Sequence, residues 1–303
     1  MKQYGLWVGF LLASLLPVPA QVGVEVVLEQ QQFLPGESLE VAVRIANRSG
    51  RALRLGTEAD WLTFAVETSQ GQAVAKYSEV PVVGEFALES SEVATKRVDL
   101  GPCFSLEAPG RYQVSASLHI PNWDVVIATQ PKSFDIVEGS SLWEQEFGVP
   151  PAASATNSAP EVRKYVLKQI HYIPGRLRFY LSVEDASGKT LRVVPIGAVL
   201  SSNRNDPRVD SASNFHFMCL TGPHSFGYYV FNPDGQLIVR RTYDYTDTRP
   251  RLVLGDKGQV SVGGGARRFA ADDFPAPKFL FPPPPPGTST SSVPPVPAPA
   301  TRP

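Results

Sequence analysis

The sequence predicts an all-β protein, built as two β-rich units followed by a proline-rich tail. Between Val22 and Val137, short segments alternate apolar and polar residues with a period of two, which is typical of half-buried strands. Turn-forming clusters separate these segments, namely LPGES, NRSG, SQGQ, EAPG and IPNWD. No stretch in this region carries a sustained helical period, and β-type patterning resumes from Val162 to Arg268.

The N-terminal unit, residues 21–138, is predicted to be an antiparallel β-sandwich. The segments LPGESLEVAVRIANRSGRAL and LEAPGRYQVSASL resemble the B–C hairpin and the F strand of bacterial immunoglobulin-like domains. This resemblance covers Val22 to Val137. It implies a tyrosine corner at Tyr112, whose phenol would bond back to the local backbone. It implies no particular activity, because this sandwich hosts many unrelated roles, and the chain lacks the Cys…Trp…Cys core of antibody-type domains.

In the second unit, residues 161–269, the sequence suggests an internal repeat. Two hairpins align at an offset of 47 (226 − 179, 235 − 188 and 238 − 191), pairing Phe179 with Phe226, Gly188 with Gly235, and Leu191 with Ile238. The segments DPRV and RPRL align next, with Pro207 against Pro250. The rhythm resembles β-propeller blades, but a closed propeller needs about four blades or more. We therefore expect a small sandwich or barrel with two blade-like meanders, and the alternative is that two chains combine.

The first twenty residues read as a signal peptide. Lys2 precedes an apolar run, and the small residues Val18 and Ala20 precede the expected cleavage point. We therefore expect a chain that is exported to the periplasm or secreted, with no membrane span in the mature form. The alternative is an N-terminal anchor helix that stays attached.

Two further segments are predicted to lie outside the β units. Residues 139–160 read as a linker, with Leu142, Trp143 and Phe147 forming an apolar patch on a short helical turn. Residues 270–303 read as a disordered Pro-rich spacer, since the run from Pro282 to Pro286 favours polyproline II. For its apolar start, Phe274, Phe279, Leu280 and Phe281, the alternatives are docking on a partner and docking on the second unit.

Composition excludes some function classes and leaves others open. The chain has a net charge of −1 and 19% charged residues, which argues against nucleic-acid binding and against electrostatic docking on anionic membranes. No motif calls for a cofactor, and the oligomeric state stays undetermined. Cys103 and Cys219 lie in different units, so two separate buried thiols are favoured over an interdomain disulfide.

The segment FHFMCL (residues 215–220) contains His216, Met218 and Cys219, and His224 follows it; all four are potential copper or zinc ligands. Read as a strand, it places Phe215, Phe217 and Cys219 on one face and the alternate residues on the other. Both faces are largely apolar, so we expect a core strand with a hydrogen-bonded histidine, and no metal site.

The predicted binding residues are Arg241, Tyr243, Tyr245 and Trp123. The first three alternate along one strand, and an exposed Tyr–Arg row is enriched in binding hot spots; the alternative is ordinary strand packing. Trp123 lies at an expected loop tip, where it would contact a ligand or anchor the loop. No catalytic residue is predicted, because the G-x-S-x-G and H-E-x-x-H motifs are absent and the acidic pairs Asp272-Asp273 and Glu144/Glu146 read as solvated charge. The sequon Asn47-Arg48-Ser49 is short enough to arise by chance.

Together these features predict an exported, non-catalytic binding or scaffolding protein. Its partner would be a protein or a glycan of the cell envelope or the extracellular space. The alternatives are a carbohydrate-binding accessory protein, and a proteinase inhibitor or an enzyme of unrecognised type. An enzyme would need a pocket with converging polar groups.

Overall fold

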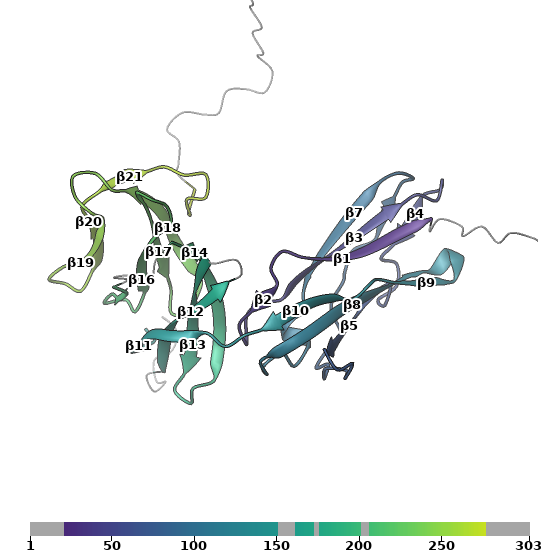
Figure 1. The fold of residues 1–303 in the computed structure, drawn as a ribbon, viewed down its shortest axis with the longest axis horizontal. Coiled ribbons are helices and arrows are strands. Elements are labelled where there is room, and N and C mark those ends of the chain that lie inside the picture. The colour runs from purple at the N-terminus through teal and green to yellow at the C-terminus, as the bar shows by residue number, and fades with distance from the viewer. Residues whose placement is uncertain (1–20, 151–160, 173–175, 201–205, 277–303) are drawn as a thin grey trace, which may run out of the picture.

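The computed structural model describes residues 21–150, 161–172, 176–200 and 206–276, and these residues form an all-β structure with two short 3-10 turns (Figure 1). The predicted fold class is confirmed. The expected signal segment and residues 277–303 of the expected tail lie outside the described residues. Among the described residues, no helix has the length and apolar character needed to cross a membrane.

The N-terminal sandwich has two main sheets, drawn in purple to blue in Figure 1. The first contains, in spatial order, β1 (Val22–Leu28), β3 (Glu40–Asn47) and β7 (Val93–Asp99). The second contains β2 (Gln32–Phe33), β10 (Lys132–Ile136), β8 (Gly110–Ile120) and β5 (Leu62–Thr68), with β9 (Val125–Ala128) paired to β8. The remaining elements are β4 (Leu53–Leu55), paired with β6 (Phe86–Leu88), and the 3-10 turns η1 (Gly101–Cys103) and η2 (Pro121–Trp123).

The period-two pattern of β8 explains how this sandwich closes. Every second residue from Tyr112 to Ile120 is buried, because successive side chains of a strand point to opposite faces. These side chains share one core with the buried face of β3 and with Trp61, which has no exposed surface and donates its indole N–H to the Val82 carbonyl at 3.0 Å. The hydroxyl of Tyr112 donates to the Ala108 carbonyl at 2.7 Å, which is the contact implied for a tyrosine corner.

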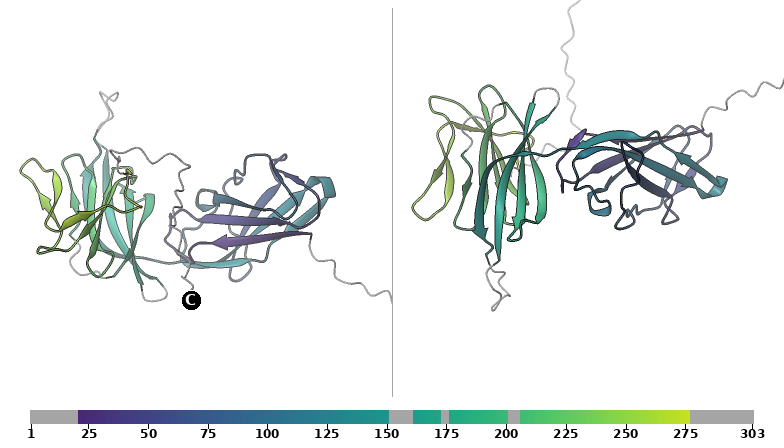
Figure 2. Two further views of the ribbon diagram at one scale, coloured as in Figure 1. Left: turned by 90° about the horizontal axis from the view of Figure 1, so that it is seen from above. Right: turned by 60° about the horizontal axis from the view of Figure 1, so that its bottom comes forward.

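The C-terminal sandwich consists of two antiparallel meanders packed face to face (Figure 2). The first sheet contains β11 (Ser140–Gly148), β12 (Val162–Tyr172), β13 (Arg176–Asp185) and β14 (Thr190–Val199). The second contains β15 (Arg208–Val209), β16 (Phe215–Leu220), β17 (Ser225–Phe231), β18 (Leu237–Asp244) and β21 (Ala266–Arg268). The hairpin of β19 (Arg251–Leu254) and β20 (Val260–Gly263) forms a separate two-stranded sheet.

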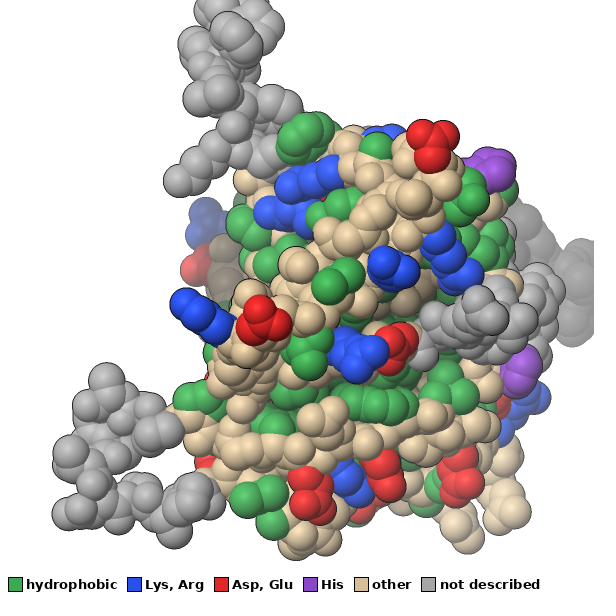
Figure 3. Space-filling model, turned by 90° about the vertical axis from the view of Figure 1, so that its left-hand side faces the viewer, with side chains coloured by type: hydrophobic (Ala, Val, Ile, Leu, Met, Phe, Trp, Pro, Cys, Tyr) green, Lys and Arg blue, Asp and Glu red, His purple; other side chains and the backbone are tan. Residues whose placement is uncertain are grey.

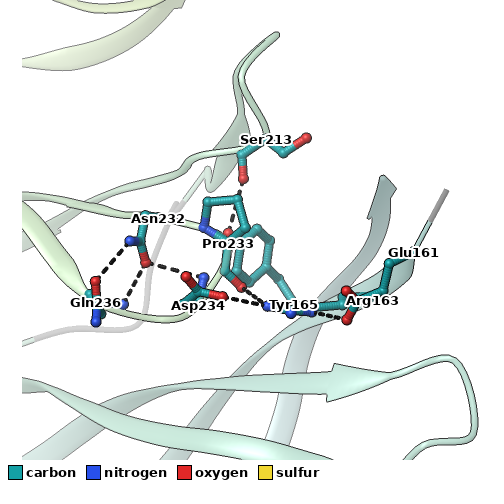
Figure 4. Close-up of polar contacts among 8 residues, drawn as sticks. All are labelled: Glu161, Arg163, Tyr165, Ser213, Asn232, Pro233, Asp234 and Gln236. Carbon is teal, nitrogen blue, oxygen red and sulfur yellow. Dashed lines mark hydrogen bonds and ion pairs between the residues drawn. The ribbon is translucent and has the colours of Figure 1, made fainter. Parts of the chain in front are cut away.

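Polar contacts join the two sheets at one end of the sandwich (Figure 4). The Arg163 guanidinium on β12 donates to the Pro233 carbonyl at 3.0 Å and to Asp234 Oδ1 at 2.8 Å. The buried Tyr165 donates its hydroxyl to the Ser213 carbonyl at 2.9 Å. Arg163 therefore ties the NPDG turn between β17 and β18 to the opposite sheet, and Tyr165 does the same for the turn between β15 and β16.

Residues 140–148 correct the linker prediction. They form β11, which pairs with β12 along its length, and not a helical turn. Phe147 is buried in the core and Trp143 packs against it, whereas Leu142 is exposed. The spacing of four residues between Trp143 and Phe147 fits one strand face equally well, because an even spacing also returns to the same side of a strand.

The structure supports only part of the internal repeat that the sequence suggests in the second unit. Gly188 and Gly235 both lie in hairpin turns with positive φ, 84° and 71°, as their alignment requires. Phe179, however, points into the core between the two sheets, whereas Phe226 points to the outer face of the second sheet. The shared turn chemistry therefore does not extend to equivalent packing.

The start of the expected tail is also corrected, because residues 270–276 lie against the second sandwich. Phe274 pairs with Arg240 on β18 through two backbone hydrogen bonds of 2.7 and 3.0 Å. Asp273 is buried and forms an ion pair of 2.9 Å with Arg267, and Asp272 pairs with Arg240. These two carboxylates are thus partners of arginines and not free solvated charge.

Both cysteines are free and buried, as predicted. Cys103 belongs to the core of the N-terminal sandwich and Cys219 to the core of the C-terminal one. Each thiol acts as a small apolar group in its own core.

A small apolar cluster joins the two sandwiches. Leu34 and Val137 of the N-terminal sandwich pack against Ile170, Tyr180 and Val193 on the outer face of the β11–β14 sheet. Gly139 makes the approach close, since a Cβ there would lie 3.1 Å from the Leu34 side chain and 3.4 Å from the Gln169 carbonyl.

Glu37 is the buried carboxyl at this junction. Its side chain accepts from the Leu34 N–H at 2.9 Å and from Gln30 Nε2 at 2.7 Å, and its backbone forms a bridge to Val193 of β14. Gln30 in turn contacts Arg178 of β13. Burial raises the pKa of Glu37 to about 7, against the lowering effect of these hydrogen bonds and of the Arg178 charge.

The pH dependence of stability tests this assignment. With a pKa raised from 4.5 to about 7, the Glu37 carboxyl destabilises the folded state increasingly as pH rises between those values. Relative to Glu37→Gln, the wild type should lose on the order of 2 kcal/mol of unfolding free energy between pH 5 and pH 8, measured by urea denaturation, since one pKa unit is worth about 1.4 kcal/mol.

The control is Glu40→Gln, which changes an exposed carboxylate on β3 nearby. It should follow the wild-type pH dependence. If Glu37→Gln follows it too, Glu37 is not titrating in this range.

Candidate functional site

Arg241, Tyr243 and Tyr245 do not form one exposed row. Arg241 and Tyr243 lie half-buried on the outer face of β18, and Tyr245 lies beyond the end of the strand and is exposed. The Arg241 guanidinium donates to the Pro275 carbonyl at 3.1 Å and also contacts the Phe274 carbonyl, so the chain's own segment engages it. Tyr243 packs edge-on against Tyr228, with ring centroids 6.2 Å apart.

Trp123 is not brought near these residues. It ends η2 in the N-terminal sandwich, next to β9, whereas β18 lies in the other sandwich (Figure 1). Its ring is partly buried against the core of its own sandwich, which is the loop-anchor arrangement that the sequence offered as the alternative.

His216 lies in a closed polar network on the outer face of β16. Its Nδ1 is 2.8 Å from the Tyr228 hydroxyl and its Nε2 is 3.1 Å from Asp210 Oδ2. Burial lowers the pKa of His216, against the opposing effect of Asp210, so the neutral ring donates from Nε2 and accepts the Tyr228 hydroxyl at Nδ1. The prediction of a core strand with a hydrogen-bonded histidine is confirmed, because both faces of β16 are buried.

A groove lies beside this network, between the outer face of β16 and β17 and the β19–β20 hairpin. Its volume is about 840 Å³. The apolar side chains of Met218, Phe226 and Leu252 line it, and Leu252 packs on the same outer cluster as the other two. The remaining lining residues are Asp206, Arg208, Cys219, Thr248, Arg249, Pro250, Arg251, Gly263 and Gly264. We call this site the arginine groove.

Three guanidinium groups line the arginine groove, from Arg208, Arg249 and Arg251. Arg208 forms an ion pair with Asp206 at 2.5 Å, but its Nε is buried without a hydrogen-bond partner. Arg249 lies over the Phe226 ring at 5.1 Å. Within the described part of the chain, no acceptor or carboxylate contacts the guanidinium of Arg249 or of Arg251.

Two glycines bring the wall of the groove together. At Gly264, with φ +75°, a Cβ would lie 2.6 Å from the Arg249 carbonyl oxygen, and at Gly265 it would lie 2.4 Å from Pro250. The turn after β20 can therefore approach the Thr248–Pro250 segment only because side chains are absent there. This close approach fixes the position of Arg249.

Figure 3 looks onto the molecule from the side on which the β19–β20 hairpin lies in Figure 1. Arginine and lysine side chains stand there among patches of hydrophobic side chains, and acidic side chains lie beside some of them. The face combines charged groups with apolar surface.

The sequence contained a signal for the arginine groove that the site predictions did not use. In each of the aligned segments DPRV and RPRL, the residue before the proline and the arginine after it line the groove. Both prolines are buried. Alignment alone does not show that the two Pro-Arg segments line one groove. That follows from β19 lying against β16, next to β15.

Two other features bear on chemistry. Glu58, Asp60 and His119 place one potential ligand atom each within 4.8 Å of one another, a set that sequence neighbours did not reveal because His119 lies on β8. They are solvent-accessible and carry no further sign of a metal. Asn47 of the sequon is fully buried, and its amide donates to the Arg51 and Leu88 carbonyls, so it is not accessible to a glycosyl donor.

Comparisons with known proteins give little guidance. No protein-family model matches the chain, and no curated protein matches it. Among solved structures, the chain is similar to Spo0M, a sporulation control protein from Bacillus subtilis, at 12% sequence identity and a TM-score of 0.29. The match covers 58% of this chain and 89% of that chain. So low a score supports no argument about function.

Stability measurements test the role of His216. His216→Ala should lower the free energy of unfolding by about 2–4 kcal/mol at pH 7.5, because it leaves a cavity and a buried Tyr228 hydroxyl without its hydrogen-bond partner, and because Asp210 loses one of its partners. Tyr228→Phe should cost only about 1 kcal/mol, since one hydrogen bond is lost. The exposed His224→Ala is the matched control and should stay within about 0.5 kcal/mol of the wild type.

The His216 network should also weaken in acid. Because the pKa of His216 is lowered from 6.5, its stabilising contribution is lost as pH falls below 6.5, and the difference between wild type and His216→Ala should shrink there. Equal stability of the His216 and His224 variants would contradict a structural role.

Proposed function

We propose that this protein is an exported, non-catalytic binding protein that holds its partner in the arginine groove. The observation that carries the proposal is a pair of guanidinium groups, Arg249 and Arg251, above an apolar floor, which no carboxylate or other hydrogen-bond acceptor contacts within the described residues. Binding sites characteristically combine an apolar lining with a few polar groups that fix orientation, in volumes of about 300–1,000 Å³. Arginine is also enriched in binding hot spots.

The titratable groups near the groove favour binding over catalysis. Burial raises the pKa of Cys219 to about 12, so its thiol stays protonated and is a poor nucleophile. Burial likewise raises the pKa of Tyr228 to about 12, and His216 uses both ring nitrogens within its own network. None of these three groups is poised for proton transfer near neutral pH.

The other finer features belong to the same proposal. The N-terminal sandwich is an immunoglobulin-like module, supported by the Tyr112–Ala108 contact and by its two sheets, in which every pair except the parallel β2–β10 pair is antiparallel. The first twenty residues are the signal peptide that directs export, supported by their apolar run and small-residue cleavage site. The C-terminal sandwich then presents the groove to envelope or extracellular partners.

A carbohydrate-stacking surface has less support. Such a surface needs flat exposed rings, and Tyr243 is only partly exposed and lies edge-on against Tyr228. The proposal therefore places the contact in the groove and not along β18.

Site-specific crosslinking tests the proposed function. A photoreactive benzophenone side chain replaces Leu252 in the groove, or Val83, which is 84% exposed on the N-terminal sandwich. The chain from Gln21 onward is irradiated with envelope extract of the organism that makes it. We expect an adduct from position 252 and not from position 83, because benzophenone reacts only with what lies against it.

Charge reversal then tests the arginines. Arg249→Glu with Arg251→Glu should abolish the adduct at position 252, whereas the same reversal at the exposed Arg51 and Arg54 should leave it unchanged. If the adduct survives reversal in the groove, or forms equally from both positions, the groove is not the binding surface.

A further inference from the structure

We propose that the arginine groove takes an extended acidic segment of a partner polypeptide, with alternating acidic and apolar residues, laid along β19 as an added strand. This rests on the proposed function, because it names the partner of the same groove. Four observations support it: a free strand edge, unpaired guanidinium groups, an apolar floor, and the charge of the chain's own remaining segments.

The β19–β20 hairpin offers the strand edge. Among the described residues, β19 pairs with β20 alone, so one edge of this two-stranded sheet has no strand beside it. Five consecutive residues, Thr248 to Leu252, line the groove, so the chain runs along it and not across it, and the last two of them begin β19. An edge of this kind pairs readily with an extended peptide through main-chain hydrogen bonds.

The side chains along β19 give the alternation expected of the partner. Leu252 packs toward the outer apolar cluster, with Met218 and Phe226, and Arg251 is exposed. In an added strand, successive side chains also point to opposite faces. One set would then enter the apolar floor and the other would meet guanidinium groups, which selects apolar residues alternating with acidic ones.

Charge complementarity selects carboxylates as the polar set. Three arginines line the groove against one aspartate, and Asp206 already pairs with Arg208. The planar fork of a guanidinium matches a carboxylate in two parallel hydrogen bonds, which a lysine cannot do.

The chain's own undescribed segments do not have this chemistry. Residues 1–20, 151–160, 173–175, 201–205 and 277–303 contain no aspartate or glutamate, and they include Lys2, Arg204, Lys278 and Arg302. Each of these segments has a net charge that is zero or positive, so none of them is attracted electrostatically to the arginines of the groove. By this criterion the occupant comes from another molecule.

Binding of synthetic peptides provides the test. The probe is a fluorescent hexapeptide of alternating Glu and Val, which spans roughly 20 Å as a strand. Its controls are the same peptide with Gln in place of Glu, and one N-methylated on alternate residues so that one edge of its backbone cannot pair. Affinity for the chain from Gln21 onward is measured by fluorescence anisotropy at low and high salt.

The expected result has three parts. The acidic probe binds about tenfold or more tightly than the Gln probe, since charge-assisted hydrogen bonds are worth about 1.5–3 kcal/mol, and added salt weakens it. Arg249→Ala with Arg251→Ala lowers the affinity by at least about the same factor, while Arg51→Ala with Arg54→Ala leaves it unchanged. The N-methylated probe binds more weakly than its parent, because strand pairing is lost.

Distinct outcomes overturn the proposal. If the acidic and Gln probes bind equally, or if the wild type and the groove variant bind the acidic probe equally, the groove does not select an acidic ligand. If the N-methylated probe binds as tightly as its parent, the peptide does not bind as an added strand. If dodecanoate binds in an Arg251-dependent way and the acidic peptide does not, the ligand is a small amphipathic anion.

The crosslinking result separates this failure from failure of the proposed function. If the adduct at position 252 needs the arginines but the acidic peptide does not bind, groove binding stands and only the partner's chemistry is wrong. If the adduct does not need the arginines, the proposed function itself falls. An adduct between two copies of this chain at position 252 would show that a second copy occupies the groove, and it would also overturn the acidic-segment proposal.

Discussion

The C-terminal sandwich depends on one constraint: the second sheet is apolar on both of its faces. On the inner face, Phe215, Phe217 and Cys219 fill the core between the two sheets. On the outer face, Met218 and Phe226 belong to a second cluster that no sheet of comparable size covers. Apolar surface of this extent is costly to leave in water, so the small β19–β20 hairpin folds over part of it. The two-stranded hairpin is too small to cover the whole outer face. The arginine groove is the part that it leaves uncovered. The groove is thus a consequence of incomplete burial.

The same outer face shows how buried polar groups stay compatible with an apolar sheet. His216 is placed among apolar neighbours, where an unpartnered imidazole would be costly. Asp210 and Tyr228 supply one partner for each ring nitrogen, so the network is satisfied internally and does not need a ligand. The groove beside it is the opposite case, since two of its guanidinium groups have no hydrogen-bond acceptor within the described residues. The same face therefore carries a polar network that is satisfied internally and, next to it, the guanidinium groups of the proposed binding site.

The junction between the sandwiches follows a related rule. Leu34 and Val137 cover part of the outer face of the first C-terminal sheet, and Glu37 enters the same contact with a carboxyl that is neutral in acid. The hydrogen bonds from Leu34 and Gln30 compensate part of the cost of burying it. Because Gly139 lets the chain pass within van der Waals distance of β12, the two sandwiches are joined by direct packing as well as by the connecting chain. The Glu37 carboxyl is thus buried at the junction between the two sandwiches, where burial raises its pKa.

The sequence by itself determined the fold class, the alternation of β8, the two-sided burial of β16 and the separate buried thiols, because period-two patterning records locally which face of a strand is buried. It did not determine that residues 140–148 pair with β12, since the apolar spacing of Trp143 and Phe147 suits a helical turn and a strand alike. Nor did it place Arg241 under the Phe274 segment, or bring the two Pro-Arg segments to one groove. Those outcomes depend on which strands become neighbours. Neighbour choice is set by contacts between residues far apart in the chain, which only the tertiary structure decides.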